Sequence, residues 1–333
     1  MKKILPVFLV VLLLSGCFAG EATESDTVYL TAMDTVMSLT AYGENRQEAL
    51  ELAQQEILRL DAMLSTGKPD SEVSRLNAGG TGNVSEDTRF LLEKSLELFA
   101  QTNGLFDISI YPLVQLWGFY DESYHVPTQQ ELAETLPLID ADRIRLSGNA
   151  VTLGAGQAID LGAIGKGYTS QRVTDILRQA GVTSAMISLG GNVQCLGTKP
   201  DGTKWNIGIR NPWDPDAGVC CIVQVEDRAV ITSGGYERNF TQDGTTYLHI
   251  LDPRTGFPAD SGLSSVSIIS RDGTLGDGLS TALFIMGLEN AATYYHAHSQ
   301  EFDAVFLTQD GQLYATPGLQ GSIQSDMDIQ YLQ

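Results

Sequence analysis

The sequence predicts an α+β fold with a mixed sheet, preceded by a lipoprotein signal at the N-terminus. The chain has 333 residues, which is enough for one large domain with a substantial core. Strand-like and helix-like segments follow one another without the regular rhythm of a doubly wound sheet. No low-complexity linker divides them, and no repeat with a period of roughly 20–50 residues is present. We therefore expect residues 28–333 to form a single domain.

Three segments have the spacing of apolar residues that is typical of amphipathic helices. The first covers residues 46–64. The second begins after Ser85, an N-cap residue followed by two acidic residues, and ends near Thr102. The third is predicted over residues 168–180 and stops before Gly181.

The strand candidates are short runs rich in β-branched and aliphatic residues. Residues 121–137, which contain two prolines, are the best candidate for an inserted subdomain or a lid. Asp310-Gly311 is a hairpin signal between the last candidate strand and residues 313–315. The candidate strands are Val28–Leu30, Val36–Ala41, Val151–Leu153, Ala185–Leu189, Trp205–Ile209, Ile222–Val225, Val266–Ile269 and Ala304–Leu307.

The chain is strongly acidic, with 41 Asp and Glu against 20 Lys and Arg and a formal net charge of −21. The acidity is spread along the chain and is not confined to a tail. Because binding to phosphate backbones depends on Lys and Arg displacing counterions, nucleic acid is excluded as the main partner.

The N-terminus has the pattern of a secretory signal with a lipobox. Two lysines precede an apolar run over residues 4–14, and Leu-Ser-Gly-Cys follows, ending at Cys17. About eleven apolar residues are too few for a membrane-spanning helix, which needs roughly twenty. The pattern resembles bacterial lipoprotein precursors, in which the cysteine is diacylated. Residues 1–16 are then the signal peptide and 17–27 a tether, and the mature protein is extracytoplasmic and lipid-anchored to the cell membrane.

The three other cysteines, Cys195, Cys220 and Cys221, are expected to be small buried hydrophobic residues. Their number is odd, and no CxxC or Cys/His spacing indicates a disulfide framework or a zinc site.

Two glycine-rich blocks could approach a ligand through the backbone. In residues 158–168 three glycines and Lys166 open a helix, so the block could hold an anion at the helix N-terminus or form a plain tight turn. Its spacing matches neither a Walker loop nor a dinucleotide fingerprint. In residues 188–193 the paired glycines permit close approach of a ligand or a β-bulge, and the pattern alone favours the bulge.

Two further blocks contain side chains with chemical potential. His249, next to an Asp-Pro turn, is either a surface or capping residue or a general base. In residues 276–283, Asp277 and Thr281 stand at i and i+4 and hence on one face of an apolar helix. A carboxylate, a hydroxyl and nearby carbonyls suit Mg²⁺, whereas the alternative is that Asp277 only caps the helix.

These four blocks, in this order, resemble the ApbE family of FAD:protein FMN transferases. The resemblance includes Met-Asp-Thr-Val-Met at 33–37, the segment 70–77 and the segment 106–119, and it extends over about residues 28–316. It implies the fold of that family and a reaction in which FAD donates its FMN half to a Ser or Thr hydroxyl of an acceptor flavoprotein. The new bond is a phosphoester, and AMP is released.

The resemblance also implies roles for individual residues. Mg²⁺ would be held by the backbone of Ala163 and the side chains of Asp277 and Thr281, with Ser280 as a further ligand position. His249 would accept the proton of the acceptor hydroxyl. Acceptors would include flavin-bearing subunits of sodium-translocating NADH:quinone reductase or Rnf-type complexes. The implied FAD-contacting residues are Met33, Leu105, Phe106, Asp107, Asp160, Lys166 and Leu251.

The sequence departs from the family pattern at two glycines. Gly67 follows Ser65-Thr66, where many members carry an aromatic residue, and Gly235 stands where a polar residue is common. A ring at position 67 could stack on FAD, and its absence removes a contact of about 0.5–1.5 kcal/mol. Two alternative functions stay open: an FAD pyrophosphatase that uses water as acceptor, and a non-catalytic flavin-binding lipoprotein.

Overall fold

The computed structural model describes residues 24–333, so the expected signal peptide and Cys17 lie outside the described residues. A nine-stranded sheet forms the centre of the molecule, in the order β1-β2-β6-β7-β10-β13-β14-β15-β17. Neighbouring strands are antiparallel except β15 and β17, which are parallel. The α+β class with a mixed sheet is confirmed. The strands are β1 (Ser25–Ala32), β2 (Thr35–Tyr42), β6 (Ser184–Leu189), β7 (Asn192–Leu196), β10 (Ala229–Gly234), β13 (Leu263–Ser270), β14 (Phe302–Thr308), β15 (Leu313–Ala315) and β17 (Ile329–Tyr331).

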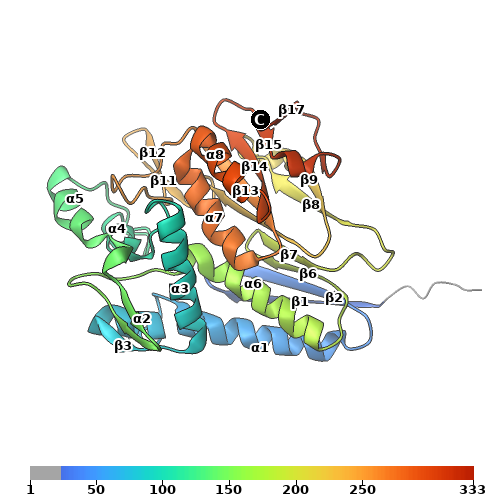
Figure 1. Cartoon of the computed structure of the whole chain (residues 1–333), viewed down its shortest axis with the longest axis horizontal. Coiled ribbons are helices and arrows are strands. Elements are labelled where there is room, and N and C mark those ends of the chain that lie inside the picture. The colour runs from blue at the N-terminus through green and yellow to red at the C-terminus, as the bar shows by residue number, and fades with distance from the viewer. Residues whose placement is uncertain (1–23) are drawn as a thin grey trace, which may run out of the picture.

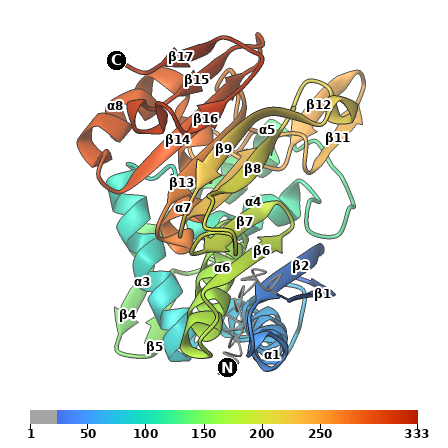
Figure 2. The ribbon, with the colours of Figure 1, turned by 90° about the vertical axis from the view of Figure 1, so that its right-hand side faces the viewer.

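Helices pack on one face of this sheet and a small sheet packs on the other (Figures 1 and 2). Two helices of the first layer, α6 and α7, lie side by side and contact each other closely. On the opposite face, β8 (Trp205–Arg210), β9 (Val219–Val225) and β16 (Ile323–Gln324) form a three-stranded sheet. The helices are α1 (Arg46–Leu64), α2 (Glu72–Gly79), α3 (Glu86–Gln101), α4 (Tyr111–Leu116), α5 (Gln129–Thr135), α6 (Gly162–Gln179), α7 (Gly273–Met286) and α8 (Leu288–His298).

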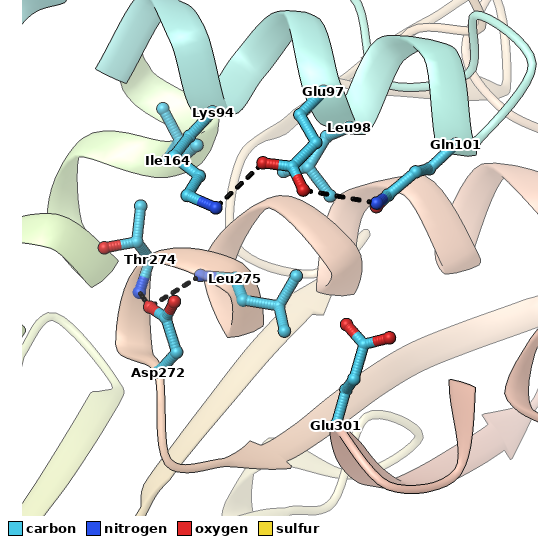
Figure 3. A pocket seen from close by; sticks show the side chains of 9 residues that line it. All are labelled: Lys94, Glu97, Leu98, Gln101, Ile164, Asp272, Thr274, Leu275 and Glu301. Atoms are coloured by element: carbon cyan, nitrogen blue, oxygen red, sulfur yellow. Dashed lines mark hydrogen bonds and ion pairs between the residues drawn. The ribbon is translucent and has the colours of Figure 1, made fainter. Parts of the chain in front are cut away.

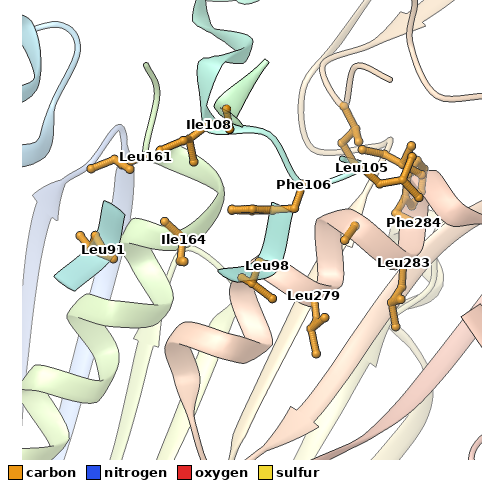
Figure 4. Packing of buried hydrophobic residues seen from close by; sticks show 14 of the residues in the cluster. Leu91, Leu98, Leu105, Phe106, Ile108, Leu161, Ile164, Leu279, Leu283 and Phe284 are labelled. Carbon is orange, nitrogen blue, oxygen red and sulfur yellow. The ribbon is translucent and has the colours of Figure 1, made fainter. Parts of the chain in front are cut away.

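The largest hydrophobic cluster lies where α3, α6 and α7 meet (Figure 4). Phe106 is at its centre, beside Leu98 of α3 and Ile164 of α6. Its ring is so close to α7 that a Cβ at Gly278 would lie 3.4 Å from it and 2.4 Å from Leu98. A glycine is therefore needed at this helix contact, and the packing fixes the axis of α7 against α3.

A small three-stranded sheet and a β-hairpin complete the fold. The strands β3 (Thr81–Asn83), β5 (Ala150–Thr152) and β4 (Arg145–Ser147) form a small antiparallel sheet. The hairpin of β11 (Asn239–Gln242) and β12 (Thr245–Leu248) stands beside α4 and α5, with which it shares an aromatic cluster.

Several sequence-based boundaries change in the structure. Strand β1 begins at Ser25, so residues 25–27, which were predicted to belong to the tether, are part of the sheet. Arg46 explains this difference because it pairs with Asp26 of β1 at 2.7 Å and with Glu24 at 2.6 Å. Helix α6 begins at Gly162, not at residue 168, because the glycine-rich block is itself helical.

The segment 121–137 is not a separate subdomain. Its helix α5 is capped by a capping box of Thr128 and Glu131. Leu132 is buried in the same cluster as Trp117 and Leu251. The segment therefore packs directly on the loop that follows His249.

The cysteine prediction is confirmed for the described residues. Cys195, Cys220 and Cys221 are free and buried, in the cluster between the two sheets. No helix within residues 24–333 combines the length and apolar character needed to cross a membrane.

Candidate active site

Two tight hairpin turns lie together at one end of the main sheet. Met33 and Asp34 connect β1 to β2 with φ of +48° and +57°. Gly190 and Gly191 connect β6 to β7 with φ of +62° and +93°. The paired glycines thus form a two-residue turn, and the predicted β-bulge is wrong, because positive φ at both positions is what such a turn requires. A Cβ at Gly190 would lie 2.3 Å from Thr35, so the turns are in contact.

The turn at Met33 is held by an ion pair of the buried Asp61 with the exposed Lys68. A non-glycine residue with positive φ is uncommon and needs support from its surroundings. The Met33 N–H donates to Oδ1 of Asp61, which is buried on α1, at 3.0 Å. The Lys68 ammonium donates to the other oxygen of Asp61 at 2.5 Å. The structure thus fixes the backbone of an expected FAD-contacting residue.

Helices α6 and α7 meet at Asp277. A Cβ at Gly167 would lie 2.1 Å from the Gly273 carbonyl oxygen and 2.5 Å from the Asp277 Cβ, so only glycine permits this approach. The Gly167 N–H donates to Oδ2 of Asp277 at 2.7 Å, and Asn192 Nδ2 donates to Oδ1 at 3.0 Å. Asp277 is buried and is not the N-cap of α7, since Asp272 caps that helix.

The charge state of Asp277 is set by opposing influences. Burial raises the pKa of its carboxyl group, while the Lys166 ammonium and the hydrogen bond from Gly167 lower it. A group that binds here and brings positive charge would favour the ionised carboxylate.

Three hydroxyls lie together, two of them on the turn of α7 that follows Asp277. Ser233 Oγ on β10 is 2.8 Å from Ser280 Oγ and 3.1 Å from Thr281 Oγ1. The Ser280 hydroxyl is fully buried and donates to the Asp277 carbonyl at 2.8 Å. Thr281 is only half-buried, one helical turn after Asp277. Of the two hydroxyls on α7, that of Thr281 is the more accessible to a ligand.

The donor set suits a hard divalent cation. It consists of the carboxylate of Asp277, the hydroxyl of Thr281 and the backbone carbonyl of Ala163, all oxygen atoms. A carbonyl oxygen has two lone pairs, so the Ala163 carbonyl on α6 keeps acceptor capacity even where it accepts one helical hydrogen bond. Across the described part of the chain, no group of three or more His, Cys, Asp or Glu side chains is arranged for a metal ion. A cation here would therefore depend on one carboxylate and neutral oxygens.

His249 follows β12 and faces Arg238, the residue before β11. Its Nδ1 lies 2.9 Å from the Arg238 carbonyl oxygen. A carbonyl can only accept, so Nδ1 carries the proton, and the lone pair of the neutral ring is on Nε2. Burial, together with the charges of Lys166 and Arg238, lowers the pKa of His249 to about 4, and the hydrogen bond to the Arg238 carbonyl opposes this shift. The ring is neutral at pH 7 and able to accept a proton.

Lys166 is the cation around which these elements converge. Its charge acts on the pKa values of Asp160, Glu237, His249 and Asp277. These residues come from the start of α6, the segment before β11, the end of β12 and α7. The site therefore gathers a neutral imidazole, a buried carboxylate and positive charge in a protein that is otherwise strongly acidic.

Asp160 has a local structural role as well. Its Oδ1 accepts the Gly162 N–H at 2.8 Å, and its own N–H donates to the Ile108 carbonyl. Burial raises the pKa of Asp160, and Lys166 and Arg238 lower it.

Other expected FAD contacts use their side chains for the fold. Leu105 and Phe106 are in the main core, and Leu251 is in the aromatic cluster around Trp117. The Asp107 carboxylate accepts from Ser109 and from the Ala141 N–H, and burial raises its pKa. The side chains at these positions therefore contribute to the fold, and their expected contacts with FAD stay predictions.

Sequence reasoning missed three residues of this site. Asn192 follows the paired glycines, and its amide orients Asp277. Ser233 contacts both hydroxyls of α7. Arg238 lies 3.8 Å from Asp34 and holds His249 through its carbonyl. The signal for Asn192 was a polar residue directly after a turn, which is where sheet ends carry functional side chains.

The pocket in Figure 3 is separate from this site. It lies between α3 and the start of α7, has a volume of about 130 Å³ and is lined mostly by polar residues such as Glu97 and Asp272. Lys94 donates to Glu97 at 2.8 Å, and Asp272 accepts from the first turn of α7. Lys94, Glu97 and Asp272 therefore already have partners, and none of the expected site residues lines the pocket.

Comparison with known proteins agrees with this geometry. The family model described as the ApbE family matches residues 33–306. A protein of Treponema pallidum named FAD:protein FMN transferase is 33% identical over 312 residues, which cover 86% of this chain and 85% of that protein. The ApbE protein of Thermotoga maritima superposes with a TM-score of 0.84 at 28% identity, covering 90% of this chain and 99% of the other. The flavinyl transferase ApbE of Pseudomonas stutzeri gives a TM-score of 0.80 at 27% identity, covering 90% and 97%.

Proposed function

The chain belongs to the ApbE family and is an FAD:protein FMN transferase, and we propose that it performs this transfer with Mg²⁺ held between α6 and α7. The observation that carries the metal proposal is the position of Asp277. Its carboxylate is held toward the first turns of α6 by hydrogen bonds from Gly167 and Asn192, and Thr281 follows it by one turn on the same face of α7. The alternative interpretation of the sequence, in which Asp277 only caps the helix, does not account for these two hydrogen bonds.

The residues of the chain divide the work of the transfer between them. The acceptor hydroxyl oxygen attacks the phosphorus that carries riboflavin, the bond to the bridging oxygen breaks, and AMP leaves. His249 Nε2 takes the hydroxyl proton, since Nδ1 is committed to the Arg238 carbonyl. Lys166 places positive charge beside the FAD phosphates. When bound, Mg²⁺ supplies further neutralisation of the pyrophosphate charge.

One assay separates transfer from its alternatives. The purified protein is incubated with FAD and Mg²⁺, with and without an acceptor domain, and AMP and covalent flavin are measured. A transferase releases AMP and forms covalent flavin only with the acceptor. AMP without an acceptor would show a pyrophosphatase, and no AMP in either mixture would show a flavin-binding protein. EDTA in place of Mg²⁺ tests the metal.

We propose that the acceptors are extracytoplasmic flavoprotein subunits, including those of sodium-translocating NADH:quinone reductase or Rnf-type complexes. The lipobox supports a location outside the cytoplasm, where such domains would be met. A domain of either complex, with its target Ser or Thr replaced by Ala as control, serves as acceptor in the same assay.

We also propose that the mature protein is anchored to the cell membrane by lipid on Cys17. The apolar run before this cysteine supports the proposal. Cys17→Ser should move the protein from the detergent phase to the aqueous phase in partitioning. Unchanged partitioning would contradict the lipid anchor.

A further inference from the structure

Tyr120 presents an aromatic ring at the surface and holds it in a fixed position. The residue follows α4, and its side chain is 43% exposed. Tyr111 packs edge-on against the ring, with centroids 5.7 Å apart and an interplanar angle of 90°. The Tyr120 hydroxyl donates to the Thr66 carbonyl at 3.4 Å. Contacts at its edge and at its hydroxyl leave a large part of the ring accessible.

Gly67 lies directly beside this ring and provides no side chain to cover it. A Cβ at Gly67 would lie 3.6 Å from the Tyr120 hydroxyl oxygen and 3.4 Å from Ser65 Oγ, which are ordinary contacts. Its φ is outside the left-handed region, so the backbone does not require glycine. Glycine is therefore required at position 67 neither by the backbone conformation nor by a close contact at Cβ. A larger side chain, however, would extend toward the space that the Tyr120 ring occupies.

The neighbours of the Tyr120 ring link it to the candidate active site. Phe119, the preceding residue, has its ring 6.5 Å from that of His249. Tyr111, which supports Tyr120, has a pKa raised to about 12 by burial and also by the neighbouring Tyr120 and Asp160. The two residues next to Tyr120, Tyr111 and Phe119, thus lie near Asp160 and His249 respectively.

We propose that Tyr120 is the platform on which one planar ring system of FAD, the isoalloxazine or the adenine, stacks during binding. The inference rests on the proposed function, since it assigns a binding contact for the same substrate. An exposed aromatic ring held edge-on by a neighbour is a rigid apolar surface, which suits a planar heterocycle. Stacking on such a ring contributes about 2- to 12-fold in affinity beyond the effect of contact area.

The test measures FAD affinity by equilibrium dialysis, in parallel with FMN and AMP, for the wild type and for Tyr120→Ala and Tyr120→Phe. Tyr120→Ala should weaken FAD binding by at least about threefold, and the half of FAD whose affinity falls in parallel identifies the stacked ring. Tyr120→Phe should keep wild-type affinity, because it keeps the ring. Tyr29→Ala is the control, since Tyr29 is 72% exposed on β1. Thermal melts establish that the variants are folded.

Two outcomes would overturn the inference alone. In the first, the wild type binds FAD and Tyr120→Ala binds it equally well. In the second, Tyr120→Phe loses as much affinity as Tyr120→Ala, which would show that the hydroxyl acts and the ring does not. A wild-type protein that binds no FAD would overturn the proposed function, and this inference with it.

Discussion

Replacement of Asp277 by alanine and by asparagine should have different effects on stability and the same effect on transfer. At a solvated helix start, a carboxylate could be removed without harm to the fold. Asp277 is instead buried at the contact of α6 and α7 and accepts two hydrogen bonds. Its replacement therefore tests the packing and the chemistry of the site at once.

The magnitude follows from the two donors. Asp277→Ala leaves the Gly167 N–H and the Asn192 amide without their acceptor, and each buried unsatisfied group costs about 1–3 kcal/mol. Burial raises the pKa of Asp277, so removal of the ionised carboxylate returns part of that cost. We expect a net loss of about 2–4 kcal/mol. Asp277→Asn keeps an acceptor for Gly167, and a rotated Asn192 amide can accept from the new amide, so its loss should be about 1 kcal/mol or less.

Urea unfolding in EDTA measures both stabilities without a contribution from metal, and FMN transfer at saturating Mg²⁺ measures activity. Both variants should lose at least about 100-fold in transfer, because a neutral side chain cannot supply the ligand charge. Equal stability of the alanine variant and the wild type would refute the hydrogen-bond argument. Transfer by the asparagine variant within about threefold of wild type would refute the metal proposal.

Three further predictions concern the rest of the site. His249→Ala should lower turnover by roughly 10²–10⁴-fold with little change in FAD affinity. Because the folded pKa of about 4 leaves the imidazole neutral above that pH, the wild-type rate should fall only as pH drops toward 4. Single-turnover transfer measured against pH should show no such decrease in the variant. Gly167→Ala should lower the free energy of unfolding in urea by about 2–3 kcal/mol, because the clash outweighs a helix-propensity gain of about 1 kcal/mol. Gly165→Ala is the control and should not destabilise the protein, because no atom lies within 4 Å of its Cβ. Asp61→Ala should cost about 1–3 kcal/mol by freeing the Met33 turn, and Asp61→Asn, which keeps the acceptor, should cost less; equal losses would contradict the role of that hydrogen bond.

The sequence predicted those elements whose signals are local. Helix α1 has its predicted bounds, and α3 begins after Ser85 because that side chain accepts the Thr88 N–H. The hairpin at Asp310-Gly311 is present between β14 and β15. Strands β7 and β10 were not predicted, because their pairing depends on partners distant in sequence, and β10 in particular lies between β7 and β13. Local patterns do not contain that information.

Tertiary contacts also explain where the site differed from expectation. The i and i+4 spacing correctly placed Asp277 and Thr281 on one face of α7, but the burial of Asp277 depends on Gly167 of another helix. Leu105 and Phe106 belong to a family motif, yet their side chains are in the core. A motif identifies which residues matter and does not distinguish a residue that touches the substrate from one that supports the backbone which does.

The same contacts explain how an acidic protein can bind a doubly charged pyrophosphate. A net charge of −21 repels such a substrate at long range, so affinity must come from a local reversal of charge. Lys166 and Arg238 supply that reversal, and burial of Asp160 and Asp277 raises the pKa of both carboxyls, which opposes their ionisation until a cation arrives. The close packing of α6 on α7 through Gly167 brings Asp277 under the influence of the Lys166 charge, so binding of the proposed metal and binding of the phosphates would favour each other.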